Sequence, residues 1–192
     1  MVDKTYDKEK LIQFLRDLDE ILTNEHLSNP IDIITLGGSA MSLLGFRTKT
    51  KDMDFFYRGI DYETFSKAVE KLYGKYREKE IDFWEDGVMQ VARKGTIISQ
   101  QLPLDYYDIS LEERIHFKNI RLKILNPVDI ILTKMGRADD DDIKDMKFLI
   151  EKFDIKKPRL VSRFKIYEQN FTGNVEALRK KFNDTINELY EP

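Results

Sequence analysis

Hydrophobic residues follow two different spacings along the chain, and the changes between them predict the order of the elements. Leucines recur at three- and four-residue steps over residues 7–27, which predicts an amphipathic helix. A short β-branched run closed by two glycines follows in NPIDIITLGG, residues 29–38, and predicts a strand that ends in a turn. Residues 39–46 have the length of a short helix, and residues 51–59 are typical of another strand.

The middle of the chain changes from a helical to an extended pattern. Residues 61–76 predict a second amphipathic helix, with Asp61 as its N-cap and Thr64 at the third helical position. Residues 79–124 lack a helical period and contain turn signals, so we expect two or three further strands there. The alternating segment IRLKIL, which begins at residue 120, is one more strand candidate.

From Asn126 onward the pattern is helical. Asn126 and Pro127 make a good N-cap and first helical residue, and three more helical stretches follow up to residue 191. The fold class is therefore α/β (α+β): a mixed sheet flanked by helices, followed by a C-terminal helical extension. We expect residues 1–125 to form the core and residues 126–192 to form a helical region packed on it.

Composition removes several classes of function. The 192 residues carry a net charge of −3 with 35% charged residues, so no general basic field is available for gripping nucleic acid. There is no cysteine, and two distant histidines do not make a histidine-rich zinc site, whereas a magnesium site built from carboxylates stays open. No apolar run approaches a membrane span, and the N-terminus does not look like a signal peptide, so we expect a cytoplasmic protein without a membrane partner.

Two aspartates stand where a buried strand is expected. Asp52 and Asp54 flank Met53, and on a strand their side chains share one face while Met53 takes the other. Two half-buried carboxylates on one face repel each other, and a divalent cation removes that penalty. Mg²⁺ prefers one or two carboxylates together with phosphate oxygens, so the spacing suits a metal–phosphate site. The alternative is an exposed edge strand that carries two acids on its polar face.

A glycine-serine turn precedes these aspartates at a fixed distance. Gly37, Gly38 and Ser39 stand where a strand is expected to run into a helix. Helix N-terminal amides and a glycine turn favour anions, and glycine lets the backbone approach a phosphate closely. The turn lacks the Gly-Lys-Ser/Thr ending of a P-loop and is not a G-x-G-x-x-G motif either.

These two motifs together resemble the nucleotidyltransferase fold of the DNA polymerase β superfamily. Its signature is a hydrophobic residue, Gly, Gly or Ser, a gap of roughly ten residues, and Asp-x-Asp between hydrophobics, which LGGS at residues 36–39 and DMDF at residues 52–55 match. The segments RTKTKDMDFF and NPVDIILTKMGRADDDDIKDMKFLI look closest to small prokaryotic members, including abortive-infection-type toxins. The resemblance covers roughly residues 31–152.

The resemblance implies a function and a set of site residues. It implies a nucleotidyltransferase that uses Mg²⁺ or Mn²⁺ and transfers a nucleotide from an NTP to an RNA 3′ end, a protein hydroxyl or a small molecule. In that function Asp52 and Asp54 bind the metal, while Gly37, Gly38 and Ser39 hold the nucleotide phosphates.

The second motif adds further nucleotide-binding candidates. Lys134, Asp142 and Asp145 fall where the family carries a lysine and acidic residues near its active site. Lys134 either binds the triphosphate, pairs with one of these two acids, or extends along the helix surface to reach solvent. The weaker candidates for phosphate contacts are four further cations, for which the alternative is a solvated surface: Arg47, Lys49, Lys51 and Arg137.

Active members of the superfamily usually carry a third carboxylate on a later strand. Our first candidate is Asp105, with Asp108 and Asp82 behind it. If no third acid reaches the pair, the chain is instead a nucleotide- or partner-binding protein of the same fold, for example one half of a toxin–antitoxin-like pair. A third reading is an α/β domain with an acidic edge strand and no nucleotide site.

Overall fold

The computed structural model describes most of the chain, and the described residues divide between two compact units. The units are Met1–Ile98 with Ser110–Ile124, and Ser99–Ile109 with Leu125–Pro192. The side chains of residues 80–83, 88, 90–92 and 112 are not among those described. The described residues are 6–25, 27–47, 50, 52–76, 80–83, 88–92, 105–106, 110–112, 115–169, 171 and 173–190.

The first unit is built around a mixed sheet of six strands in the order β3-β4-β2-β1-β6-β5. Its central strand β1 pairs antiparallel with β2 and parallel with β6, and every other pairing is antiparallel. All five residues of β1 are buried, and four of them are β-branched, as a strand covered on both faces favours. The fifth, Asp32, pairs with Arg121 of β6. The strands are β1 (Ile31–Thr35), β2 (Met53–Arg58), β3 (Glu80–Phe83), β4 (Val88–Ala92), β5 (Leu111–Glu112) and β6 (Ile120–Ile124).

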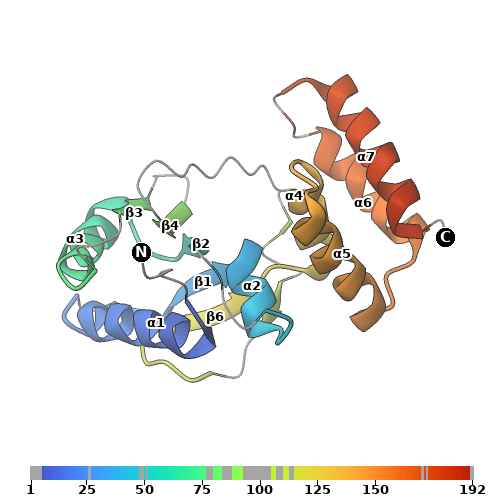
Figure 1. Ribbon diagram of the computed structural model, residues 1–192. Coiled ribbons are helices and arrows are strands. Elements are labelled where there is room, and N and C mark those ends of the chain that lie inside the picture. The colour runs from blue at the N-terminus through green and yellow to red at the C-terminus, as the bar shows by residue number, and fades with distance from the viewer. Residues whose placement is uncertain are drawn as a thin grey trace. The chain divides into compact units, whose positions relative to one another are not determined.

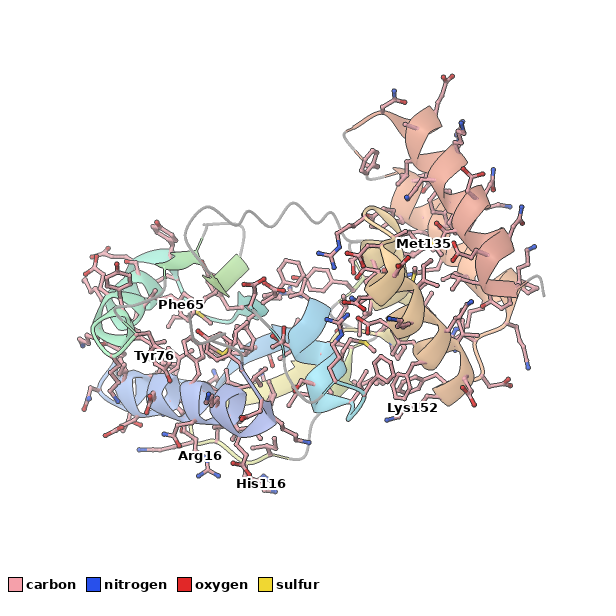
Figure 2. The ribbon with its side chains drawn as sticks, in the orientation of Figure 1. Arg16, Phe65, Tyr76, His116, Met135 and Lys152 are labelled. Carbon is pink, nitrogen blue, oxygen red and sulfur yellow. The ribbon has the colours of Figure 1, made fainter. Side chains whose placement is uncertain are left out.

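Three helices are described in this unit (Figure 1): α1 (Lys8–Thr23), α2 (Gly37–Leu43) and α3 (Tyr62–Tyr73). The Asp61 carboxylate accepts the Thr64 amide at 2.9 Å, so the predicted cap of α3 is confirmed. Aromatic rings join α3 to β2, where Phe65 stacks on Tyr57 with ring centroids 3.9 Å apart. Figure 2 shows Phe65 within the unit rather than on the outer side of α3.

Helix α1 also fixes the start of β6. The Asp19 carboxylate accepts the amides of Lys118 and Asn119 at 3.0 and 2.6 Å. The Asn119 carbonyl in turn accepts the Ile31 amide at 2.8 Å, at the first residue of β1. These bonds hold the loop before β6 beside β1, which is the register that the parallel pairing needs.

The described part of the second unit is dominated by four helices: α4 (Pro127–Met135), α5 (Asp140–Lys152), α6 (Lys157–Gln169) and α7 (Val175–Tyr190). Asn126 caps α4 by accepting the Val128 amide at 3.0 Å, with Pro127 at the first helical position as predicted. Phe164 of α6 stacks on Phe182 of α7 with ring centroids 3.8 Å apart.

The predicted fold class is confirmed, since a mixed sheet flanked by helices is followed by a helical C-terminal region. Within the described residues, no helix has the length and apolar character that crossing a membrane requires.

Candidate functional site

The predicted metal pair lies where β2 meets the turn between β1 and α2. Gly37 opens α2 with a backbone φ of +54°, a conformation that favours glycine. A Cβ atom on Gly37 would lie 2.8 Å from Oδ2 of Asp54, closer than such contacts normally come. The carboxylate of Asp54 therefore packs directly against the first residue of α2, in the space that the missing side chain leaves. Asp52 lies immediately before β2, and both aspartates are half-buried.

Ser39 bonds to the backbone of both aspartates. Its hydroxyl donates to the Asp52 carbonyl at 3.4 Å and accepts the Asp54 amide at 3.1 Å. The Leu36 amide adds a bond to the Asp54 carbonyl at 3.2 Å. Ser39 is fully buried. The start of α2 and the start of β2 are thus joined by one serine side chain, which the sequence analysis assigned to phosphate binding alone.

Thr50 is a site residue that the sequence analysis missed. Its hydroxyl donates to the Asp52 carbonyl at 3.0 Å. A Cβ atom on Gly38 would lie only 2.2 Å from Thr50 Oγ1, so residue 38 must be glycine for Thr50 to hold this position. The signal was present in the strand alternation, because Thr50, Asp52 and Asp54 stand two residues apart.

Tyr6 completes this side of the site. An isolated antiparallel bridge joins it to Thr50, with the two amide–carbonyl bonds both 2.7 Å long. Burial raises the pKa of the Tyr6 hydroxyl well above its usual range, and the negative charge of Asp52 acts in the same direction. The phenol therefore stays neutral at physiological pH, within the electrostatic reach of the Asp52 carboxylate.

In the second unit, Lys134 lies between Asp142 and Asp145, and pairing with one of these acids was one of the three alternatives that the sequence left open for it. Its Nζ is 2.9 Å from Asp142 Oδ1 and 2.7 Å from Asp145 Oδ2, and all three side chains are at least 93% buried. Arg137 donates to Asp142 from Nε and Nη2, at 2.7 and 2.9 Å. Burial alone would raise the pKa of Asp142, but the hydrogen bonds from Arg137 and Lys134 hold it below its usual value. That these residues bind nucleotide stays a prediction.

A second ion cluster joins Asp105, the first candidate for a third carboxylate, to two buried residues, although Asp105 itself is exposed. Arg163 of α6 holds Asp129 through two bonds of 2.6 and 2.8 Å, and Asp105 through two bonds of 2.7 and 2.9 Å. Asp129 is fully buried, and burial raises its pKa although the Arg163 hydrogen bonds act against that shift. Arg163 was also missed, and its sequence signal is a charged residue within the apolar stripe of α6.

The two other candidates for the third carboxylate, Asp108 and Asp82, are described to different extents. Asp108 lies outside the described residues. Asp82 is described only in its backbone, which pairs with Gln90 of β4, and Gln90 pairs in turn with Asp54 of β2. Asp82 thus occupies the same cross-strand row as Asp54, two strands away. Within the described part of the chain, no group of three His, Cys, Asp or Glu side chains is arranged to hold a metal ion.

The described part of the chain does not bring the four weaker candidates for phosphate contacts together. Lys49 and Lys51 lie outside the described residues. The backbone amide of Arg47 bonds to the Met41 carbonyl at 3.4 Å, just after α2. Arg137 is paired with Asp142 and Asp139.

One protein family matches nearly the whole chain. Residues 9–189 match the model of a family described as "Nucleotidyltransferase of unknown function (DUF6036)". The chain belongs to this family. None of the curated proteins matches the sequence. A crystal structure of an antigenic nucleotidyltransferase-like protein from Paracoccidioides brasiliensis is similar at 14% sequence identity and a TM-score of 0.47, covering 98% of this chain and 100% of that one. The family match therefore places the chain in a nucleotidyltransferase family, as the resemblance implied.

Proposed function

We propose that the protein is a Mg²⁺-dependent nucleotidyltransferase that moves a nucleoside monophosphate from an NTP to a hydroxyl acceptor. The observation that carries the proposal is the Asp54 carboxylate packed against the glycine turn that opens α2, with Asp52 two residues before it. Family membership supports the reaction class. The acceptor is an RNA 3′ end, a protein hydroxyl or a small molecule, and the assay below distinguishes an RNA from a protein acceptor.

The donor set fits a magnesium ion. Two carboxylates on one short segment match the preference of Mg²⁺ for one or two protein carboxylates, with phosphate oxygens as further ligands. When bound, the ion supplies charge neutralisation for the phosphates and lowers the pKa of the attacking hydroxyl. Manganese is suited to the same oxygen ligands.

The residues of this chain contribute binding and orientation. Asp52 and Asp54 present their carboxylates at the start of β2, and the first turn of α2 faces the nucleotide phosphates, where backbone amides favour negative charge. The acceptor oxygen forms a bond to the α-phosphorus while the bond from that phosphorus to the β-phosphate oxygen breaks. Pyrophosphate leaves with the bonding electrons, and the hydroxyl proton passes to solvent or to a nearby base.

Label transfer tests this proposal. The full chain is incubated with each α-labelled NTP, Mg²⁺ or Mn²⁺, and total cellular RNA or protein. We expect transfer that disappears in Asp52→Asn and Asp54→Asn but persists in Asp140→Asn, a matched change at an exposed first-turn acid of α5. Asp82→Asn and Asp105→Asn in the same assay show which of these acids, if either, serves as the third carboxylate.

A second candidate function is nucleotide or partner binding without chemistry, as in one half of a toxin–antitoxin-like pair. The observation that favours it is that Asp105 is held by Arg163 within the second unit. Metal-dependent NTP binding that is lost in Asp52→Asn, with no label transfer by the wild type, supports this second function. Absence of both binding and transfer in the wild type refutes both.

A further inference from the structure

We propose that Thr50 and Ser39 are positioning residues whose hydroxyls fix the Asp52–Asp54 backbone, and so aim both carboxylates at the metal. This inference deepens the proposed function and rests on it. It assigns Ser39 a role different from phosphate binding, and it assigns Thr50 a role in the site.

Two hydroxyl groups converge on one carbonyl oxygen. Thr50 and Ser39 both donate to the Asp52 carbonyl oxygen, at 3.0 and 3.4 Å. A carbonyl oxygen has two lone pairs, so these two bonds use its full accepting capacity. The orientation of the peptide plane that follows Asp52 is therefore determined from two directions.

The Ser39 hydroxyl already donates its one hydrogen bond and accepts another. Its single hydrogen points to the Asp52 carbonyl, and one of its lone pairs receives the Asp54 amide. A phosphate oxygen at neutral pH only accepts hydrogen bonds, so it would have to take the hydrogen that Asp52 now receives. The side chain is also fully buried. These contacts make Ser39 a support for the two aspartates.

Close contacts with side chains from the aspartate segment account for the glycines at positions 37 and 38. A Cβ atom on Gly38 would lie 2.2 Å from Oγ1 of Thr50, and one on Gly37 would lie 2.8 Å from Oδ2 of Asp54. Each glycine thus admits a side chain from the segment that carries the aspartates. The glycine turn and the Asp-x-Asp segment are packed against each other, and Thr50 is part of that contact.

The backbone of Thr50 is itself fixed by hydrogen bonds to Tyr6. Its amide and carbonyl both bond to Tyr6 at 2.7 Å, and Thr50 is buried. The hydroxyl that orients Asp52 is therefore carried by a backbone segment that is fixed from the other side. Positioning groups beside metal ligands typically alter metal affinity or activity by about 10- to 100-fold when they are removed.

Metal binding by the full-length protein tests the inference. Calorimetric titration with Mn²⁺ in the presence of a non-hydrolysable NTP analogue compares the wild type with Thr50→Val, Thr50→Ser and Ser39→Ala. The matched control is Ser42→Ala on the same helix, because Ser42 Oγ is buried and has no hydrogen-bond partner among the described residues. Urea unfolding of each variant verifies that it is folded.

We expect Thr50→Val and Ser39→Ala to weaken Mn²⁺ binding by about 10-fold or more, while Thr50→Ser and Ser42→Ala stay near the wild type. In the transfer assay the first two variants lower kcat and raise the Mg²⁺ requirement, with little change in KM for the NTP at saturating metal. If folded Thr50→Val binds Mn²⁺ as tightly as the wild type, the inference is wrong. If only Ser39→Ala changes, and it raises KM for the NTP, Ser39 is a phosphate ligand instead.

A stability cycle tests the same contact without any ligand. Gly38→Ala lowers the urea midpoint because the new methyl group meets the Thr50 hydroxyl, and Thr50→Ala in the same chain recovers part of that loss. Additive effects of the two changes would contradict the packing argument. Failure of the proposed function is recognised separately, since a wild type that binds neither Mn²⁺ nor the nucleotide analogue refutes that function whatever the variants do.

Discussion

Replacing Lys134 by methionine removes the cation from between two buried carboxylates. Lys134 Nζ lies 2.9 Å from Asp142 and 2.7 Å from Asp145, and each carboxylate is 1% exposed. At an effective dielectric constant of about 20, each contact has a gross attraction of roughly 6 kcal/mol, most of which offsets the cost of burying the charges. Removing one partner leaves that cost uncompensated, so we expect Lys134→Met to lower the free energy of unfolding by about 3–5 kcal/mol.

The matched control is Lys144→Met, the same chemical change on α5. Lys144 pairs with Asp141 at 3.3 Å, and their side chains are 69% and 70% exposed. Exposed pairs contribute little, so we expect a loss of at most about 0.5 kcal/mol. Equilibrium urea unfolding, followed by far-UV circular dichroism, measures both. If the two variants lie within about 1 kcal/mol of each other, the reasoning about the buried cluster is refuted.

The pH dependence gives an independent check. The folded-state pKa of Asp142 lies below its ordinary value of 3.8, because hydrogen bonds from Arg137 and Lys134 outweigh the effect of burial. A lowered carboxyl pKa contributes stability above the unfolded value and loses it as the pH falls through the folded value. Without Lys134 that pKa moves up, so the stability gap between the wild type and Lys134→Met narrows as the pH falls through the folded-state pKa of Asp142 in the variant and then through that in the wild type. A gap that widens in acid would contradict the assignment.

Two further predictions concern the other buried contacts. Arg163→Met leaves the fully buried Asp129 without its cation and should cost about 3–5 kcal/mol in urea unfolding; a loss under 1 kcal/mol would argue that the cluster adds nothing. Gly37→Ala should cost about 1–2 kcal/mol through its positive φ, and should also reduce label transfer because it displaces the Asp54 carboxylate. Gly45→Ala has a positive φ and no neighbour within 4 Å, so it should lose stability but keep transfer; equal transfer by both variants would refute the displacement.

Local signals in the sequence were sufficient to predict most of the helices and strands. The caps at Asp61 and Asn126 depend on the residue and on the two or three positions that follow, so they could be read directly. The Asp-x-Asp strand and the glycine turn could also be connected, because their separation along the chain is part of a known pattern. Asp52 lies just before β2 rather than within it, since strand boundaries depend on the partner strand.

Ion pairs between residues far apart in the chain could not be predicted from the sequence. Asp129 lies in the first turn of α4, where an acidic residue is ordinary, but its buried carboxylate is paired with Arg163, which is 34 positions later. Asp105 looked available for a metal, but Arg163 holds it across 58 positions. Pairings of this kind depend on how helices pack, and the spacing of one segment does not encode them. Pairing of Lys134 with one of these acids was among the alternatives because all three residues lie on helices that are neighbours in sequence. That it pairs with both Asp142 and Asp145 was not predicted.

The parallel pairing of β1 with β6 has a consequence for how the protein folds during synthesis. The paired residues Asp32 and Arg121 are 89 positions apart, and the chain passes through the Ser99–Ile109 segment of the second unit before it returns to form β6. Pairings of such long range form slowly, because closing the loop costs entropy before any contact compensates for it. One side of β1 therefore stays an open strand edge until residue 124 has emerged from the ribosome, and during translation this edge is open to pairing with other chains.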